Sequence, residues 1–142
     1  MELCRANVPG PGLRRLLMIG YVTLGTNDIE RAAAFYDALL GELGASRFME
    51  SETFIAWTVS PTTPAISVIK PNDGNPATVG NGVMVAISVD STDKVDQLHA
   101  KALELGAKDE GAPGERGDGG FYAGYFRDLD GNKLNAFCMS QG

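Results

Sequence analysis

Two stretches of the chain repeat the same order of apolar and polar positions. One begins at Tyr21 and reads YVTLGTNDIERAAAFYDALLGELGA, and the other begins at Met84 and reads MVAISVDSTDKVDQLHAKALELGA. Each opens with β-branched or alternating apolar residues, which are typical of a strand. Each then passes through Asn, Asp, Ser or Thr, which favour a helix N-cap, and continues with apolar residues at helical spacing. Both stretches therefore predict a strand followed by a helix.

The apolar positions of each predicted helix fall on one face, because they recur every three or four residues. These positions are Ile29, Ala33, Tyr36, Leu40 and Leu43 in the first helix and Val95, Leu98, Ala102 and Leu105 in the second. Both helices end in Leu-Gly-Ala, where the glycine can take the left-handed C-cap conformation. The doubling is therefore a repeat of structure rather than a chance match of four letters.

Short segments with strand character follow each predicted helix. They lie at about 46–49, 54–59 and 66–70 in the first half and at about 107–110, 121–127 and 133–139 in the second. The segments KPNDGNPATVGNG and EGAPGERGDGG are rich in Gly, Pro and Asn and predict a linker and a flexible loop. Each half thus reads βαβββ. We predict an α+β fold of two such modules, about 18–70 and 83–139, in a single domain over 17–142 with residues 1–16 as an N-terminal extension.

Composition and charge narrow the classes of partner. The 142 residues carry a formal net charge of −6, and 44% of them are hydrophobic. Nucleic acids and anionic membranes both need a basic surface, so neither is expected as a partner. No apolar run is long enough to span a bilayer. A small anionic ligand in a local pocket remains compatible with this charge.

The two cysteines indicate a reduced protein. Cys4 lies in the predicted extension and Cys138 in an apolar run, and the chain has no CxxC motif. This usage predicts two separate thiols rather than a disulfide, and a cytoplasmic location.

Three segments together resemble the vicinal oxygen chelate superfamily, which comprises glyoxalase I, the bleomycin-resistance proteins, the extradiol dioxygenases and their relatives. The segments are GYVTLGTNDIERAAAFYDALLGELGA, VMVAISVDSTDKVDQLHAKALELGA and FYAGYFRDLDGNKLNAF. The resemblance covers about residues 18–139. It implies that each βαβββ module forms a curled mixed sheet and that the two sheets enclose a cleft. Members often form homodimers, so a homodimer is expected here.

The resemblance also implies where a metal site would lie. Metal-dependent members hold a divalent ion with histidines and carboxylates on the first, fourth, fifth and eighth strands. The matching positions in this chain are Tyr21, Ser67, Met84 and Asn135, and none is a histidine or a carboxylate. A phenol, a hydroxyl, a thioether and an amide are a poor ligand set for a divalent ion. We therefore predict no metal and no cofactor.

The remaining candidate residues suit a small organic ligand in an apolar cleft. The predicted ligand-binding residues are Tyr21, Trp57, Ser67, Met84, Tyr125 and Asn135. Tyr122 stays open as an alternative to Tyr125, because the alternation in FYAGYF does not fix which set faces the cleft. Gly124 in that segment indicates a bend or a close approach. The same side chains could instead fill a closed core.

Other motifs give weaker signals. His99, the single histidine, lies in the second predicted helix at the border of its apolar face and predicts a half-buried or surface residue. DLDGN imitates the start of a calcium loop, but the twelfth position is Met139, so it predicts a tight turn at Gly131. Alternation places Cys138 opposite Asn135. Arg116 could contact an anion but is predicted to be solvated.

Two classes of function stay open. The first is metal-free binding of a small organic molecule, similar in logic to the bleomycin-resistance members, and the missing metal ligands favour it. The alternative is an enzyme of the same superfamily, either a lyase or isomerase similar to lactoylglutathione lyase or a dioxygenase. A purely structural or regulatory dimer is a third possibility. We take ligand binding as the hypothesis.

Overall fold

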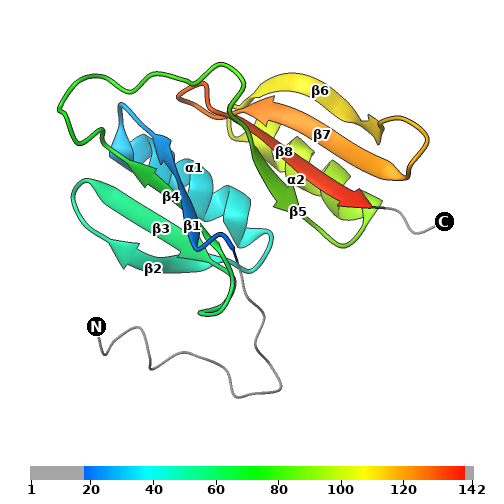
Figure 1. Cartoon of the computed structure of the whole chain (residues 1–142), viewed down its shortest axis with the longest axis horizontal. Coiled ribbons are helices and arrows are strands. Elements are labelled where there is room, and N and C mark those ends of the chain that lie inside the picture. Colours follow the sequence, from blue (N-terminus) through cyan, green and yellow to red (C-terminus); the bar gives the residue numbers. More distant parts are fainter. Residues whose placement is uncertain (1–17, 140–142) are drawn as a thin grey trace.

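The computed structural model describes residues 18–139 (Figure 1). The predicted extension over residues 1–16, with Cys4, lies outside the described residues. The elements in chain order are β1 (Tyr21–Gly25), α1 (Ile29–Gly41), β2 (Ser46–Glu50), β3 (Phe54–Thr58), β4 (Ala65–Ile69), β5 (Val85–Ser88), α2 (Thr92–Glu104), β6 (Lys108–Glu115), β7 (Phe121–Arg127) and β8 (Lys133–Met139). This order confirms the predicted α+β fold of two βαβββ modules.

Each module forms one mixed sheet of four strands. The first sheet has the order β1-β4-β3-β2 and the second β5-β8-β7-β6. In each, the first strand of the module pairs in parallel with its last strand, while the other neighbours are antiparallel. The sheets lie side by side with β1 and β5 at their inner edges (Figure 1). Over residues 18–139 they stay separate sheets and do not close into a barrel.

The helices begin and end as their sequences predict. The Asp28 side chain accepts a hydrogen bond from the backbone N–H of Arg31, and Ser91 does the same for Lys94. After each helix a glycine takes a left-handed φ, +79° at Gly44 and +103° at Gly106. The buried face of each helix packs against its own sheet, and these residues form the core of the molecule.

The prediction for the segment EGAPGERGDGG was wrong in part. It was predicted to be a flexible loop, but β6 extends to Glu115 and pairs with β7. The pairing register shifts twice, between Asp109 and Gly111 and between Gly111 and Gly114. Such bulges let a strand absorb glycines and a proline without losing its partner. The predicted linker KPNDGNPATVGNG is confirmed, since it contains no helix or strand.

Each sheet has one face covered by its helix and one face turned away from it. Alternate residues of each strand lie on the face turned away, which we call the first open face in the first sheet and the second open face in the second. Register pairing defines their members. They include Tyr21, Thr23, Phe54, Ala56 and Ser67 on the first and Ala86, Phe121, Ala123, Tyr125, Lys133, Asn135 and Phe137 on the second.

The hydroxyl of Tyr122 settles which set of β7 faces the helix. It donates to Asp96 of α2 at 2.7 Å, so Tyr125 and not Tyr122 belongs to the second open face. Cys138 is buried on the helix side, opposite Asn135, as alternation predicts. A side chain at Gly124 would lie 3.1 Å from the His99 ring, which confirms the predicted close approach.

His99 is buried, so the prediction of a half-buried or surface residue was wrong. Its Nε2 lies 3.1 Å from Asp109 Oδ1 and 3.1 Å from the carbonyl oxygen of Tyr125. The reason is that β6 packs against α2, where Asp109 gives the ring a partner that the periodicity of the helix alone does not reveal. A histidine that bridges a helix to its sheet in this way is structural.

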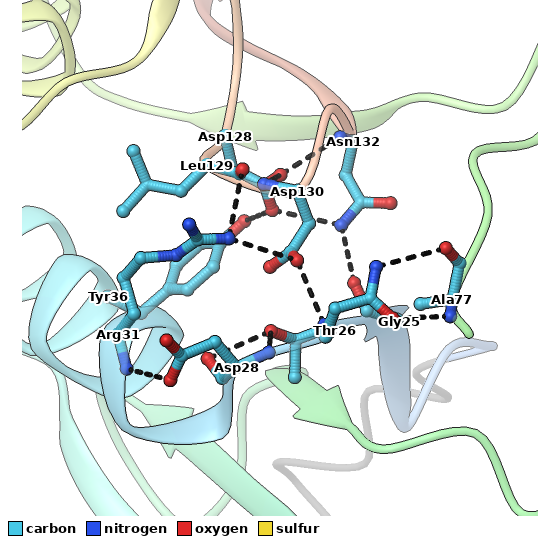
Figure 2. Close-up of polar contacts among 11 residues, drawn as sticks. Gly25, Thr26, Asp28, Arg31, Tyr36, Ala77, Asp128, Leu129, Asp130 and Asn132 are labelled. Atoms are coloured by element: carbon cyan, nitrogen blue, oxygen red, sulfur yellow. Dashed lines mark hydrogen bonds and ion pairs between the residues drawn. The ribbon is translucent and has the colours of Figure 1, made fainter. Parts of the chain in front are cut away.

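The turn between β7 and β8, residues 128–132, ties the second module to the first (Figure 2). The Tyr36 hydroxyl on α1 donates to Asp128 Oδ2 at 2.6 Å. The Asn132 side chain donates to the carbonyl of Gly25 at 2.9 Å. Burial and the neighbouring Asp128 carboxylate raise the pKa of Tyr36 well above its ordinary value. The DLDGN sequence therefore serves as a turn and as a bridge between the modules.

Candidate ligand-binding site

A cavity of about 620 Å³ lies where β5 meets the first module, and we call it the junction cavity. Its walls come from β1, the end of α1, β3, the start of β4, and β5. The lining residues are Ile19, Val22, Leu40, Leu43, Ala45, Trp57, Thr58, Val59, Thr63, Pro64, Ala65, Ile66, Met84, Val85, Ala86, Ile87 and Ser88.

The junction cavity is mainly apolar, with a few hydroxyl groups. Thr58, Thr63 and Ser88 are its hydroxyl-bearing residues. Cavities of about 300–1,000 Å³ with apolar walls and a few polar groups are typical of small-molecule sites. The cavity can therefore hold a small, mostly apolar organic molecule.

Trp57 and Met84 are the predicted ligand-binding residues that line this cavity. Trp57 is also a core residue, since its indole N–H donates to Asp37 at 2.8 Å and its ring lies 5.6 Å from that of Tyr36. Arg47 donates to the same carboxylate and holds the pKa of Asp37 below its usual value. The cavity wall at Trp57 is thus fixed by the pairing of β3 with β2 and α1.

Tyr21 and Ser67 lie on the first open face. Tyr21 is 63% exposed, and Phe54 packs edge-on against it with ring centroids 6.3 Å apart. Ser67 is fully buried, and its hydroxyl donates to the carbonyl of Val22 at 2.8 Å and lies 3.2 Å from the Thr23 hydroxyl. Tyr21 is therefore accessible to a ligand, whereas Ser67 already has partners.

Tyr125 and Asn135 are direct register partners on the second open face. Asn135 is 1% exposed, and its Oδ1 is a buried oxygen that finds no hydrogen-bond partner within residues 18–139. Ala86, which lines the junction cavity, is its register partner on β5. The six predicted residues thus lie in three places, namely the junction cavity and the two open faces. Ala86 of β5 links the cavity to the second open face, because it lines the cavity and pairs with Asn135.

Several residues at these places were not predicted. Leu40 and Leu43 line the cavity from α1, and the segment 63–66 lines it from β4. Their sequence signal was only that of an apolar helix face and a strand start. Lys133 was also missed, and it lies over the Tyr125 ring together with Arg116. A lysine after a tight turn gives no sequence signal for such a placement.

The four positions that would carry a metal in related proteins do not fit a divalent ion. Tyr21 and Ser67 belong to one sheet, and Met84 and Asn135 lie at or in the other. Their side chains offer a phenol, a bonded hydroxyl, a thioether and an amide, which are weak donors for such an ion. Across residues 18–139 no three His, Cys, Asp or Glu side chains gather into a metal-binding group.

Residues 18–136 match the sequence profile of the Glyoxalase/Bleomycin resistance protein/Dioxygenase superfamily. A solved structure of a glyoxalase/bleomycin resistance protein from Albidiferax ferrireducens T118 is 34% identical, with a TM-score of 0.79 over 87% of this chain and 100% of that one. A search of curated proteins gave no match.

Two more distant structures share the fold alone. One is a glyoxalase/bleomycin resistance protein/dioxygenase family enzyme from Burkholderia phytofirmans PsJN, at 20% identity and a TM-score of 0.69 over 85% of this chain and 98% of that one. The other is a lactoylglutathione lyase from Agrobacterium tumefaciens, at 19% identity and a TM-score of 0.65 over 88% and 96%.

Proposed function

This chain belongs to the glyoxalase/bleomycin resistance protein/dioxygenase superfamily, and from that premise we propose that it binds a small organic molecule without the help of a metal ion. The observation that carries the proposal is the junction cavity, whose volume of about 620 Å³ and apolar walls suit such a molecule. In this proposal Trp57 and Met84 contact the ligand in the cavity, and the binding residues on the two open faces are Tyr21, Ser67, Tyr125 and Asn135.

The chemistry of the metal positions supports binding rather than metal-assisted catalysis. A lyase or dioxygenase of this superfamily would need an ion that polarises two oxygens of its substrate. Tyr21, Ser67, Met84 and Asn135 offer no imidazole and no carboxylate. Ser67 donates its hydroxyl proton to a backbone carbonyl, so it is not free to turn toward an ion.

We further propose that the chain works as a homodimer in the cytoplasm. Large apolar side chains at and beside the open faces are exposed, among them Tyr21, Met49, Met84 and Met139. A second copy would cover them, and the open face of one copy would then wall the ligand site of the other. No helix within residues 18–139 is long and apolar enough to cross a membrane.

The proposal is tested by two measurements on the full chain. Mass spectrometry of the native protein, before and after incubation with Ni²⁺, Zn²⁺, Mn²⁺ and Fe²⁺ salts, should find no stoichiometric ion. Thermal-shift screening of small aromatic compounds should find ligands that raise the melting temperature, because binding to the native state alone stabilises it.

A matched pair of variants ties the screen to the cavity. Ala86→Leu adds bulk inside the junction cavity and should abolish the thermal shift. Ala77→Leu makes the same change on the linker between the modules, outside the cavity lining, and should preserve it. A stoichiometric metal ion, or ligands that bind the Ala86→Leu variant unchanged, would contradict the proposal.

A further inference from the structure

We propose that the ligand of the second open face is an organic anion and that Arg116 and Lys133 bind its acidic group. This inference rests on the proposed function, in which Tyr125 and Asn135 are binding residues, and it names the chemical class of the group bound beside them. The acidic group is a carboxylate or a phosphonate, and the remainder of the molecule is apolar. The residues of this site lie in β7, in β8 and just beyond the end of β6.

Two cations contact the Tyr125 ring, one from each side of β7. The guanidinium carbon of Arg116 lies 5.3 Å from the ring centroid, and the Lys133 ammonium lies 5.4 Å from the same centroid. Both distances are within the range of a cation–π contact. Arg116 comes from just beyond β6 and Lys133 from the start of β8, so pairing of both strands with β7 creates this arrangement.

The arginine is held in place by its surroundings. Its Nη2 donates to the carbonyl of Ala112 at 2.6 Å. Gly111 lies beneath both groups, because a side-chain carbon there would come 3.3 Å from Arg116 Nη2 and 3.3 Å from Tyr125 Cδ2. Arg116 is exposed, as predicted, but this hydrogen bond holds its guanidinium, and the other N–H groups keep donor capacity for a ligand.

Several basic residues lie on this face although the whole chain carries −6, and acidic Glu110 lies among them. Lys108 and Arg127 are register partners of this same face, so four of the twelve basic residues gather here. Arg127 binds Glu110 at 2.7 Å, and that bond, with weaker attraction from Lys108 and Lys133, lowers the pKa of Glu110. Among the described residues no carboxylate is within ion-pair distance of Arg116 or Lys133. Both cations therefore keep the capacity to form charge-assisted hydrogen bonds with the acidic group of a ligand.

Next to the cations the face offers an apolar surface and an unused hydrogen-bond acceptor. The ring centroids of Phe121 and Phe137 lie 5.5 Å apart. Ala123, between Phe121 and Tyr125 on the same face of β7, has only a small side chain. Asn135 adjoins Tyr125 and has a buried Oδ1 without a partner. Buried polar atoms normally have a partner, and a hydroxyl or N–H group of a ligand would supply one to this oxygen once the side chains that cover it move.

The test is an NMR titration of the full chain, labelled with ¹⁵N, with benzoate, phenylphosphonate and benzamide. Benzoate or phenylphosphonate should bind with a dissociation constant in the millimolar range and shift the amide signals of Gly111 and Tyr125. The better of the two identifies the acidic group. Benzamide has the same shape as benzoate without its charge and should bind at least about tenfold more weakly, because contacts to charged groups are the stronger ones.

Variants then assign the effect to the two cations. Arg116→Gln and Lys133→Gln should each weaken anion binding by about tenfold and leave benzamide binding unchanged. Lys70→Gln removes the same charge from an exposed position of the first module and should change nothing. Lys133→Arg keeps the charge and should keep the affinity, which separates loss of the contact from loss of the fold.

Three results would overturn the inference. Equal affinity for benzamide and benzoate would leave the proposed function intact but would show that the site does not select an anionic ligand. Failure of both anions to shift Gly111 and Tyr125, while the thermal-shift screen finds ligands, would place the ligand elsewhere. An equal loss of affinity in Lys70→Gln and Lys133→Gln would show a diffuse charge effect instead of a site.

Discussion

At the scale of single residues, Tyr36 shows how a polar group is placed in this core. Its ring packs against Phe35 and Trp57, and its hydroxyl donates to Asp128 in the other module. The sequence identified Tyr36 as part of the buried helix face but could not reveal its partner, which lies 92 residues further along. Periodicity gives the direction of a side chain within its own element, and it contains no information about long-range partners.

Tyr36→Phe should lower the free energy of unfolding by about 1–3 kcal/mol at neutral pH, because the buried carboxylate of Asp128 loses a donor. Urea unfolding followed by circular dichroism measures this. Tyr122→Phe removes a hydroxyl that donates to Asp96 at the surface, and it should lower the free energy of unfolding much less. Equal losses in both variants would contradict the assigned role of Tyr36.

The pKa of Tyr36 adds a dependence on pH. The pKa of Tyr36 is higher in the folded state than its ordinary value of 10.0. The contribution of its hydroxyl to folding stability is therefore complete below pH 10.0 and declines as the pH rises above that value. The difference in stability between the natural chain and Tyr36→Phe should therefore narrow above that pH. A constant difference from neutral to strongly alkaline pH would contradict this linkage.

Asp37 should make stability depend on pH in the acidic range. Arg47 lowers its pKa from 3.8, so the stabilisation is present above that value and declines as pH falls through the folded-state pKa. The stability difference between the natural chain and Asp37→Asn should thus be larger at pH 7 than at pH 3 in urea titrations. Equal stability differences at the two pH values would contradict the role of the Arg47 contact.

At the scale of elements, the strands and helices that follow strong patterns were predictable and β6 was not. The two helices have caps, an apolar face and a terminal glycine, and each of these signals is local. The sequence predicted that the β6 strand ends at about residue 110, because glycine and proline are rare in strands. In the structure β6 includes five more residues, 111–115. Pairing with β7 decides their conformation, and pairing is a property of the tertiary structure.

The turn between β7 and β8 should be sensitive to a single methyl group. Gly131 has a φ of +89°, and a side-chain carbon there would lie 3.2 Å from Val79 Cγ1. Gly131→Ala should therefore cost about 1 kcal/mol or more in unfolding free energy. Gly41→Ala is the control, because that residue ends α1 with open space around it and alanine favours the helix. A stable Gly131→Ala protein would contradict the strain argued here.

At the scale of the whole molecule, the doubled module could be predicted from the sequence, but the arrangement of the two modules could not. The repeat indicates how each half folds. The contacts that join the halves are individual hydrogen bonds, such as that between Asn132 and Gly25 or between Asn27 and Asp130. Because the junction cavity lies between the halves, the sequence alone could suggest Trp57 and Met84 for it but could not group them with the end of α1.

The proposed homodimer gives the last prediction. If the exposed apolar residues of the open faces meet a second copy, the chain should have twice its mass of 15.0 kDa in light scattering coupled to size-exclusion chromatography. Tyr21→Glu places a charge on the first open face and should yield a monomer, because an unpaired buried charge is costly. Leu103→Glu puts the same charge on α2, where Leu103 is an exposed apolar residue away from both open faces, and should leave the dimer intact. A natural chain that stays monomeric at high concentration, or dissociation by both variants alike, would show that the open faces are not the interface. In that case the ligand would have to bind within one copy of the chain.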